Sequence, residues 1–339
     1  MLSSLLVSLV LVVGLSAWTA PTPAGELPAH HLKRGFRNVD PGYDYSLLER
    51  TKRLLTLEAA PPRGSAPAVV ANDGVELRAN GFKPTITWVG HSTFLIQIAG
   101  VNILTDPTWS EGASPVGFAG PRRLVPPGLQ FDDLPPIDVV VISHDHYDHL
   151  DAPTVERISR EHHPLFVVPL GLKSWLASVG ITEAVELDWW DSARVRGLTL
   201  TCTPAQHSSG RGLRDQNLRL WASWVIASPS RRLYFAGDTG YYPGLVEIGR
   251  RLGPFDLALL PIGGYNAYAT HHPNHLNPEE AVRLFQELRA RVMVPMHYGT
   301  FDFNREPFRE PPDRLLREAI RPAVEARIAI LHPGETLHW

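Results

Sequence analysis

A short apolar run that ends in a cluster of histidine and aspartate is the feature that most constrains this sequence. Val139–Ile142 has the composition of a buried strand, and His144, His146, Asp148 and His149 follow it directly. Side chains alternate along a strand, so we expect His144 and His146 to point the same way, with a turn bringing the other two round. Imidazole and carboxylate groups bind Zn²⁺, and also iron or manganese. Four such groups exceed the needs of one tetrahedral ion with an open position, so the run predicts two ions.

Three more ligand-type side chains follow apolar runs elsewhere in the chain. They are His207 after Leu198–Cys202, Asp238 after Arg232–Phe235, and His297 after Val292–Val294. A polar residue that follows an apolar strand lies at the rim of a sheet rather than in its core. The predicted sets are His144, His146 and His207 for one ion, and Asp148, His149 and His297 for the other. A carboxylate bridges two cations, which an imidazole normally does not, so the shared ligand is expected to be Asp238.

From Lys83 onward the chain consists of short apolar runs bounded by glycine and proline. We expect strands at Thr85–Val89, Phe94–Ile98, Val101–Leu104, Val139–Ile142, Leu198–Cys202, Trp221–Ala227, Arg232–Phe235, Val292–Val294 and Ile328–Leu331, with Ala99-Gly100 turning a hairpin. We expect helices at Tyr45–Leu57, Pro153–Glu161 behind an Asp151 cap, Gly171–Val179, and Pro278–Leu288 behind an Asn277 cap. Strands followed by helices in two loose halves predict an α/β (α+β) fold with sheets inside and helices outside.

The composition narrows the class of protein. Of the 339 residues, 44% are hydrophobic and 20% charged, a balance that supports a buried core and excludes disordered or collagen-like chains. The net charge of −3 offers no basic excess for a nucleic-acid partner. The single cysteine, Cys202, excludes an intrachain disulfide and a cysteine-based zinc site, and it is expected to be chemically inert.

The chain begins with an uncharged segment, Met1–Ala20. Its apolar part, Leu5–Trp18, is shorter than the roughly 20 residues of a membrane span. We therefore expect residues 1–20 to be a signal peptide or an N-terminal membrane anchor, which makes the protein exported (periplasmic) or membrane-anchored. Residues 21–80 are expected to form an N-terminal extension, and no domain boundary is expected after residue 80.

The order His-x-His-x-Asp-His at residues 144–149 resembles the signature of the metallo-β-lactamase superfamily. The strings PPIDVVVISHDHYDHLD, VPLGLKSW, ELDWWD, AGDTGYYP, GPFDLALLPIGGY, HLNPEEAV and HYGTF resemble, in order, the N-acyl-phosphatidylethanolamine-hydrolysing phospholipase D family, in its bacterial form. The resemblance spans Lys83 to Pro312. It implies a four-layer αββα sandwich in a single hydrolase domain over residues 81–339, two zinc ions, and the ligand assignment above.

The family resemblance also implies a reaction. A metal-bridging hydroxide is expected to attack phosphorus and release phosphatidic acid and an N-acylethanolamine. Asp148 and Asp238 are expected to be catalytic, and His275 matches a family histidine near the substrate phosphate, which implies phosphate binding or proton transfer. A lactonase or a soluble phosphodiesterase on the same scaffold is the alternative. A non-catalytic zinc-binding module and a membrane-associated structural protein are rivals that explain the seven ligands less well.

Two further polar residues are expected to hold the metal ligands in place through hydrogen bonds. At a few other positions the sequence differs from the family. Asp106 follows a predicted strand and is the candidate to bind the outer nitrogen of a ligand imidazole, and His91 is a second candidate for a supporting group. The departures are Asp145 where the family often has Asn, Asn277 where it often has Asp, Tyr298 where it often has Trp, and the Ser208–Arg211 loop, which is expected to line the entrance.

The expected partner is a small molecule or a phospholipid, the latter presented at a membrane surface. A lipid substrate requires an apolar groove. The aromatic loops at Trp109–Pro127 and Tyr265–Tyr268 are candidates for it, because aromatic side chains favour the membrane interface.

Overall fold

The computed structural model describes residues 27–40, 64–115, 120–265, 272–301, 306–321 and 323–339. The helix expected at Tyr45–Leu57 and the apolar segment at 1–20 lie outside these residues, as does most of the Tyr265–Tyr268 loop. Within the described residues, none of the helices has the length and apolar character needed to span a bilayer.

The first sheet has seven strands in the order β13-β1-β2-β3-β4-β5-β6. Its strands are β1 (Thr85–Gly90), β2 (Thr93–Ile98), β3 (Val101–Thr105), β4 (Val139–Val141), β5 (Leu165–Pro169), β6 (Ala184–Leu187) and β13 (Thr336–His338). β13, β1, β2 and β3 pair antiparallel, whereas β3 to β6 pair in parallel. β1 and β2 are buried along their whole length, so both faces of this sheet are covered.

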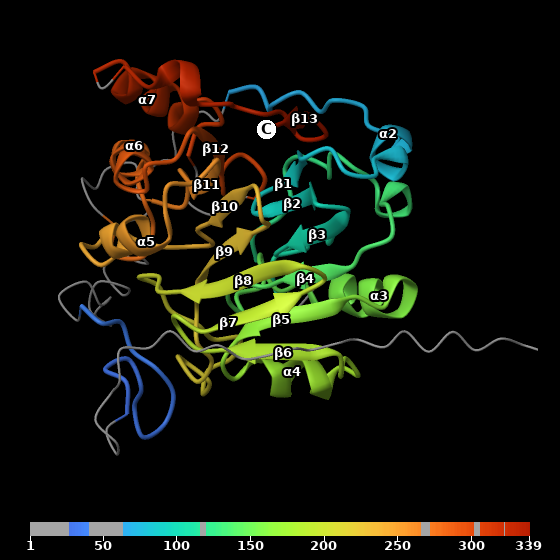
Figure 1. Cartoon of the computed structure of the whole chain (residues 1–339), viewed down its shortest axis with the longest axis vertical. Helices are drawn as coiled ribbons and strands as arrows, with labels where there is room; N and C mark the ends of the chain where they lie inside the picture. The colour runs from blue at the N-terminus through green and yellow to red at the C-terminus, as the bar shows by residue number, and fades with distance from the viewer. Residues whose placement is uncertain (1–26, 41–63, 116–119, 266–271, 302–305, 322) are drawn as a thin grey trace, which may run out of the picture.

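The second sheet has six strands in the order β12-β11-β10-β9-β8-β7. Its strands are β7 (Ser192–Val195), β8 (Leu198–Thr203), β9 (Ser223–Ala227), β10 (Arg232–Phe235), β11 (Leu257–Pro261) and β12 (Val292–Met296). β7 to β10 pair antiparallel, and β10, β11 and β12 pair in parallel. The strands of the two sheets lie in adjacent layers in Figure 1.

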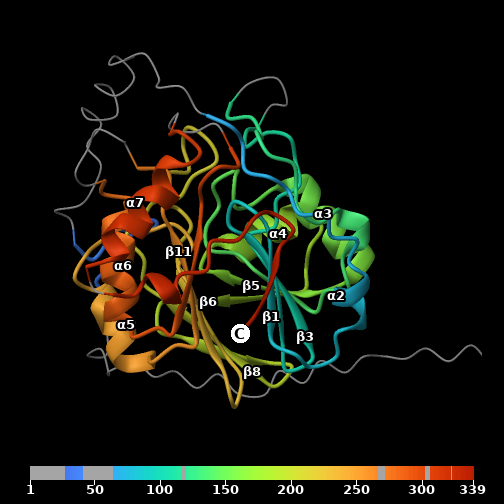
Figure 2. The same ribbon diagram turned by 90° about the horizontal axis from the view of Figure 1, so that it is seen from above.

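Helices cover the outer faces of both sheets. Viewed from above, α5 (Leu245–Leu252), α6 (Pro278–Glu287) and α7 (Glu310–Ala319) lie on one side, and α2 (Val75–Ala79) and α3 (Ala152–His162) lie on the other (Figure 2). The remaining helical segments are α4 (Leu172–Ser178), η2 (Phe131–Asp133) and η3 (Glu325–Arg327). The prediction of a four-layer αββα sandwich in one domain is confirmed.

Alternation along the first sheet explains its two apolar faces. Phe94 and Ile96 belong to the core shared with the second sheet, while their neighbour Leu95 packs in a separate cluster with Ile158 of α3 and Leu172 of α4. Successive side chains of a strand point to opposite faces, so one strand supplies both cores.

The two caps expected from the sequence have different outcomes. Asn277 accepts a hydrogen bond from the Glu280 amide at 2.8 Å, and the Glu280 side chain accepts from the Asn277 amide at 3.1 Å, which confirms the cap of α6. Asp151 stands at the N-cap of α3 but makes no side-chain cap bond there. Its carboxylate instead accepts from the Ser110 amide and hydroxyl at 3.0 and 2.8 Å, so it ties down the loop after β3.

One expected strand is wrong. Ile328–Leu331 forms only a single parallel bridge, from Ile328 to Met293 of β12, because Pro333 and Gly334, with φ +93°, then turn the chain toward β1. The late strand is β13 instead. The sequence pattern also did not predict the strands β5, β6, β7 and β11 or the helices α2, α5 and α7.

His144 and His146 were expected to point the same way because they would lie on one strand, but the strand ends before them. β4 ends at Val141, because the Ser143 amide donates to the Asp106 carboxylate at 2.7 Å rather than to a neighbouring strand. His144 and His146 therefore lie on a loop. Strand alternation does not orient them, and the prediction that it does is wrong.

Candidate metal centre

All seven side chains predicted as metal ligands converge at one end of the two sheets. They come from the segments that follow β4, β8, β10 and β12, and they are His144, His146, Asp148, His149, His207, Asp238 and His297. Neighbouring parallel strands end at the same edge of a sheet, so polar residues just beyond them meet in space although they are distant in sequence. His91, which follows β1, joins them.

The first group, which we call the histidine half-site, consists of His144, His146 and His207. The Nε2 atom of His144 lies 2.9 Å from Nδ1 of His146, and Nε2 of His207 lies 3.2 Å from that same Nδ1. His144 and His207 are almost fully buried. Three imidazole nitrogens that point at one another are a donor set suited to a single Zn²⁺ ion.

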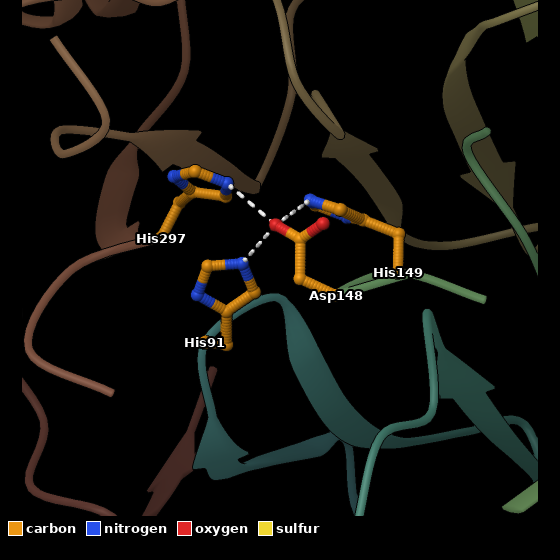
Figure 3. A group of neighbouring side chains, drawn as sticks. All are labelled: His91, Asp148, His149 and His297. Carbon is orange, nitrogen blue, oxygen red and sulfur yellow. Dashed lines mark hydrogen bonds and ion pairs between the residues drawn. The ribbon is translucent and has the colours of Figure 1, made fainter. Parts of the chain in front are cut away.

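The second group, which we call the aspartate half-site, consists of Asp148, His149 and His297. Figure 3 shows the two imidazoles and that of His91 directed at the Asp148 carboxylate. Oδ2 of Asp148 lies 3.2 Å from Nε2 of His149 and 3.6 Å from Nε2 of His297. His91 donates a hydrogen bond from Nε2 to the same oxygen at 3.0 Å, so it holds the carboxylate in place.

Asp238 lies between the two half-sites. Its Oδ2 atom approaches Nε2 of His297 at 3.0 Å, of His149 at 3.2 Å, of His207 at 3.7 Å and of His144 at 4.0 Å. One carboxylate oxygen thus faces two imidazoles of each half-site. This is the position required of a ligand shared by two ions.

His275 lies at the same centre. Its Nδ1 atom is 3.7 Å from Oδ2 of Asp238, and its ring centroid is 5.2 Å from that of His207 and 5.3 Å from that of His297. The His275 side chain is 18% exposed, whereas the side chains of His144, His149, His207 and His297 are 0–3% exposed. His275 therefore stands on the more open side of the centre.

Hydrogen bonds from Nδ1 atoms that face away from the centre fix the orientation of ligand imidazoles. Nδ1 of His149 donates to Asp106 at 2.7 Å, and Nδ1 of His207 donates to the Asn274 carbonyl at 2.9 Å. The Ser143 hydroxyl donates to Asp106 at 2.6 Å, so the contact of 2.9 Å between this hydroxyl and Nδ1 of His144 requires the imidazole to be the donor. These partners leave Nε2 of each ring without its proton in the neutral imidazole, as a metal ligand requires.

Asp106 thus binds the outer nitrogen of a ligand imidazole as expected, and His91 supports the Asp148 carboxylate, whereas Ser143 and Asn274 were missed. Ser143 directly precedes the His-x-His-x-Asp-His motif, and its hydroxyl was a signal that could have been used. The Asn274 contact is made by a main-chain carbonyl, for which the sequence carries no signal.

The histidine half-site favours neutral imidazoles. Burial, which penalises the charged ring, lowers the pKa of His144 well below its usual value and the pKa of His207 to about 3. Burial also lowers the pKa of His146. The pKa of His275 is lowered well below its usual value for the same reason.

The aspartate half-site favours charged imidazoles in the absence of a metal ion. Burial again opposes the charge, but Asp238 and Asp148 outweigh it and raise the pKa of His297 to about 9 and that of His149 well above its usual value. Burial would raise the pKa of each carboxyl group, yet the neighbouring His149 lowers the pKa of Asp148 and of Asp238 well below the usual range.

The residues fit a pair of divalent cations. Among the described residues, Oδ1 of Asp238 is buried and makes no hydrogen bond, and the same holds for Nε2 of His149 and Nδ1 of His275. Buried polar atoms are normally paired, so atoms of this kind on side chains that meet at one centre indicate a ligand. Gly264 leaves room beside them, since a Cβ there would lie 2.9 Å from Nδ1 of His275.

Three residues of the centre have an uncommon backbone conformation. His91, Asp106 and His297 have φ values of 53°, 36° and 61°, in the left-handed region that side chains other than glycine rarely adopt. Each follows a strand directly. The reversal of the chain at these points directs a polar side chain into the centre, and such conformations concentrate at functional sites.

The Ser208–Arg211 loop, expected to line the entrance, packs on the metal-binding loop. The Gly210 amide donates to the Asp145 carboxylate at 2.7 Å, and Arg211 donates to the carbonyls of Asp145 and Leu150 at 2.8 and 2.7 Å. Arg219 forms an ion pair with the fully buried Asp145. Asp145 thus anchors the loop that carries His144, His146, Asp148 and His149.

Other residues singled out by the sequence take structural roles. Trp109 donates from its indole to the Leu129 carbonyl at 3.0 Å and packs edge-on against Phe131, and Tyr265 is 1% exposed. Both aromatic rings thus pack against the protein. Burial raises the pKa of the Cys202 thiol well above its usual value, which keeps the thiol uncharged and unreactive.

Comparison with known proteins agrees with the geometry. A family model described as a beta-lactamase superfamily domain matches residues 101–298. An uncharacterized protein of Mycobacterium tuberculosis is 44% identical over 310 residues, covering 88% of this chain and 82% of that protein. The N-acyl-phosphatidylethanolamine-hydrolyzing phospholipase D 1 of Caenorhabditis elegans is 44% identical over 241 residues, covering 68% of each chain.

A solved structure supports the same conclusion. Igni18, a metallo hydrolase from the archaeon Ignicoccus hospitalis, superposes with a TM-score of 0.57 at 28% identity, covering 76% of this chain and 98% of that one. The sandwich fold and the buried histidine–aspartate cluster are those of a metal-dependent hydrolase. The chain therefore belongs to the metallo-β-lactamase superfamily, and an N-acyl-phosphatidylethanolamine-hydrolysing phospholipase D is among its relatives there.

Proposed function

We propose that this protein is a binuclear zinc phosphodiesterase of the phospholipase D type, which cleaves N-acyl-phosphatidylethanolamine-like lipids to phosphatidic acid and an N-acylethanolamine. The observation that supports this most is the position of Asp238, whose Oδ2 atom faces imidazoles of both half-sites at 3.0–4.0 Å. The 44% identity to the Caenorhabditis elegans phospholipase D supports the substrate class.

The bound zinc ions would supply Lewis acidity and a water that is deprotonated at neutral pH. His144, His146 and His207 would hold one ion, Asp148, His149 and His297 the other, and Asp238 both. No serine or cysteine nucleophile is required in this reaction. In the hydrolysis, a new bond forms between a water oxygen and phosphorus, and the bond from phosphorus to the ethanolamine oxygen breaks.

His275 is assigned to the substrate. It is more exposed than the ligand imidazoles and lies 3.7 Å from Asp238, so a phosphate at the centre would come within its reach. Its lowered pKa keeps the ring neutral at pH 7, able to donate one hydrogen bond and accept another. We therefore assign it phosphate binding, or proton transfer to the departing alcohol. His275→Gln is expected to lower kcat/KM while the protein retains two ions.

The test is turnover by the purified full-length chain with its metal content measured. N-acyl-phosphatidylethanolamine in mixed micelles, a bis-aryl phosphate and a lactone are compared as substrates, in water enriched in ¹⁸O. The expected result is two zinc ions per chain and fastest turnover of the lipid, with the label in phosphatidic acid. His144→Ala is the inactive control.

Several outcomes would overturn the proposal. Turnover of the lactone alone would identify a lactonase, and turnover of the bis-aryl phosphate without the lipid a soluble phosphodiesterase. Label in the N-acylethanolamine would mean that a different bond breaks. Iron or manganese in the purified protein would show that the bound metal is not zinc. An absence of bound metal would remove the basis of the mechanism.

We further propose that the chain meets its lipid at a membrane surface and is exported or anchored through residues 1–20. The support is the uncharged apolar run Leu5–Trp18. Fractionation of cells that express the full chain, with mass spectrometry of its N-terminus, distinguishes a cleaved signal from a retained anchor. Recovery of the uncleaved chain in the cytosol would contradict both.

A further inference from the structure

The segment 27–40 lies against the metal centre although it precedes the matched family domain by 60 residues or more. It belongs to the N-terminal extension expected from the sequence. Asn38 within it is 4% exposed, and its side chain reaches the His207 loop. Burial of this kind is unusual for a polar residue of a peripheral extension.

Asn38 binds the main chain of a metal ligand on both sides. Its Nδ2 atom donates to the His207 carbonyl at 2.9 Å, and its Oδ1 atom accepts from the His207 amide at 3.1 Å. β8 ends at Thr203, so no neighbouring strand pairs with this residue in a ladder. A carboxamide offers a donor and an acceptor side by side, and few other side chains can satisfy both groups.

A second contact joins the segment to the loop beyond His207. The Phe36 amide donates to the Asn217 carbonyl at 2.8 Å, and Asn217 in turn accepts from and donates to the Ser209 main chain. Gly35, with φ +80°, makes this approach possible, since a Cβ there would lie 2.2 Å from the Asn217 carbonyl oxygen. The segment therefore holds the loop at two points.

A pair of histidines anchors the other end of the segment. Nε2 of His30 and Nε2 of His31 each donate to a different oxygen of Asp188, both at 2.7 Å. The His30 ring stacks on Trp189 with centroids 4.2 Å apart. These three groups could in principle hold a metal ion, but each carboxylate oxygen already has an imidazole partner, so we interpret them as an anchor.

We propose that the segment 27–40 completes the metal centre, with Asn38 as a positioning residue for His207 and His30, His31 and Asp188 as its anchor. The consequence is selective. His207 belongs to the histidine half-site, so loss of the contact weakens the hold on that ion and leaves the aspartate half-site intact. This inference rests on the two-ion site proposed above and not on the identity of the substrate.

The experiment measures the release of zinc from the loaded full-length protein to a chromophoric chelator. Asn38→Ala is expected to speed the release of one of the two ions by about tenfold or more, in line with the effect of groups that orient metal ligands. Asn38→Asp keeps the shape and the acceptor but places an oxygen against the His207 carbonyl, and it is expected to act in the same direction. Asp188→Ala is expected to give a smaller change on the same ion.

Asn80→Ala is the matched control. Asn80 binds the main chain of Lys83 in the same way, donating to its carbonyl at 2.9 Å and accepting from its amide at 3.0 Å. Lys83 precedes β1, whereas the centre lies beyond the opposite end of that strand. This variant is expected to release both ions as the unmodified protein does.

Three results would overturn the inference: unchanged release in both Asn38 variants, equal acceleration of both ions, or the same change in the Asn80 control. Each would make Asn38 an ordinary packing residue. A protein that binds two ions, responds to Asn38→Ala as expected and hydrolyses no N-acyl-phosphatidylethanolamine would overturn the proposed function alone.

Discussion

The two half-sites share Asp238 but differ in the pKa values of their imidazoles. In the histidine half-site, burial keeps the imidazoles neutral, with the pKa of His207 lowered to about 3. In the aspartate half-site, Asp238 and Asp148 override the same burial and raise the pKa of His297 to about 9. An ion that enters the first finds nitrogens ready to bind, whereas an ion that enters the second must displace protons.

The difference shows that burial alone does not set the state of a ligand. Both groups are buried. They differ because Asp238 lies closer to the imidazoles of the aspartate half-site, at 3.0 and 3.2 Å against 3.7 and 4.0 Å, and because Asp148, held by His91 at 3.0 Å, adds a second carboxylate there. A site of this kind is expected to bind its two ions with different pH dependence. Each prediction below changes both half-sites, one of them or neither, and the responses of the two half-sites are compared.

The largest effect is expected for Asp238→Asn, which acts on both half-sites. The amide lacks the charge that faces four ligand imidazoles, so we expect metal content to fall below two per chain and hydrolysis to fall by about 10³-fold, since metal stabilisation of a transition state contributes several kcal/mol. Metal analysis and turnover are measured together. Retention of two ions with activity within tenfold of the unmodified protein would show that Asp238 is not shared.

The next largest effect concerns the pH dependence of the free energy of unfolding in the metal-free protein, to which the two half-sites contribute differently. The raised pKa of His297 adds stability below its unfolded value near 6.5, and this contribution is lost as the pH rises toward 9. We expect the free energy of unfolding, measured with a chelator present, to fall by a few kcal/mol between pH 6.5 and 9. His297→Gln should reduce that slope and leave the part due to His149, whose pKa is also raised, whereas His207→Gln should not reduce it. An unchanged slope in His297→Gln would contradict the assignment.

A smaller effect is expected for Asp106→Asn, which weakens the support of both half-sites. Asp106 accepts from His149 at 2.7 Å and from Ser143, the partner of His144, at 2.6 Å. Loss of the charge is expected to weaken metal binding by about 10–100-fold, measured by chelator competition. Asp256→Asn, at the start of β11 and at the other end of the sheet, is the control and should leave affinity unchanged.

The smallest effect is expected outside both half-sites. Asn277→Ala removes the cap of α6 and should lower the free energy of unfolding by about 1 kcal/mol, measured by urea denaturation. Both ions should remain bound, because neither half-site draws a ligand from this helix. Loss of either ion in this variant would mean that the helix start positions the centre.

The convergence of the seven ligand-type side chains was predictable from the sequence because they share a pattern. Each follows an apolar run, and a strand end is where a sheet presents polar groups. The loop conformation of His144 was not predictable from alternation, because the hydrogen bond from Ser143 to Asp106 ends β4 early, and that bond depends on tertiary contact. β7, with the sequence SARV, carries too weak a pattern to be recognised as a strand.

The contact of Asn38 with the main chain of His207 could not be predicted from the sequence, for a related reason. The extension showed only proline-rich stretches and scattered charge, and nothing local indicates that a residue near position 38 meets the main chain near position 207. Contacts of that sequence separation follow from the completed fold rather than from any short pattern.

The left-handed conformations of His91, Asp106 and His297 limit how this protein can evolve toward heat resistance. Glycine at any of these positions would relieve about 1–3 kcal/mol of unfavourable backbone energy, and it would delete a working side chain in the same step. At these three positions, a gain in stability from glycine would therefore be accompanied by damage to the centre. Adaptation to higher temperature has to come from substitutions elsewhere in the chain.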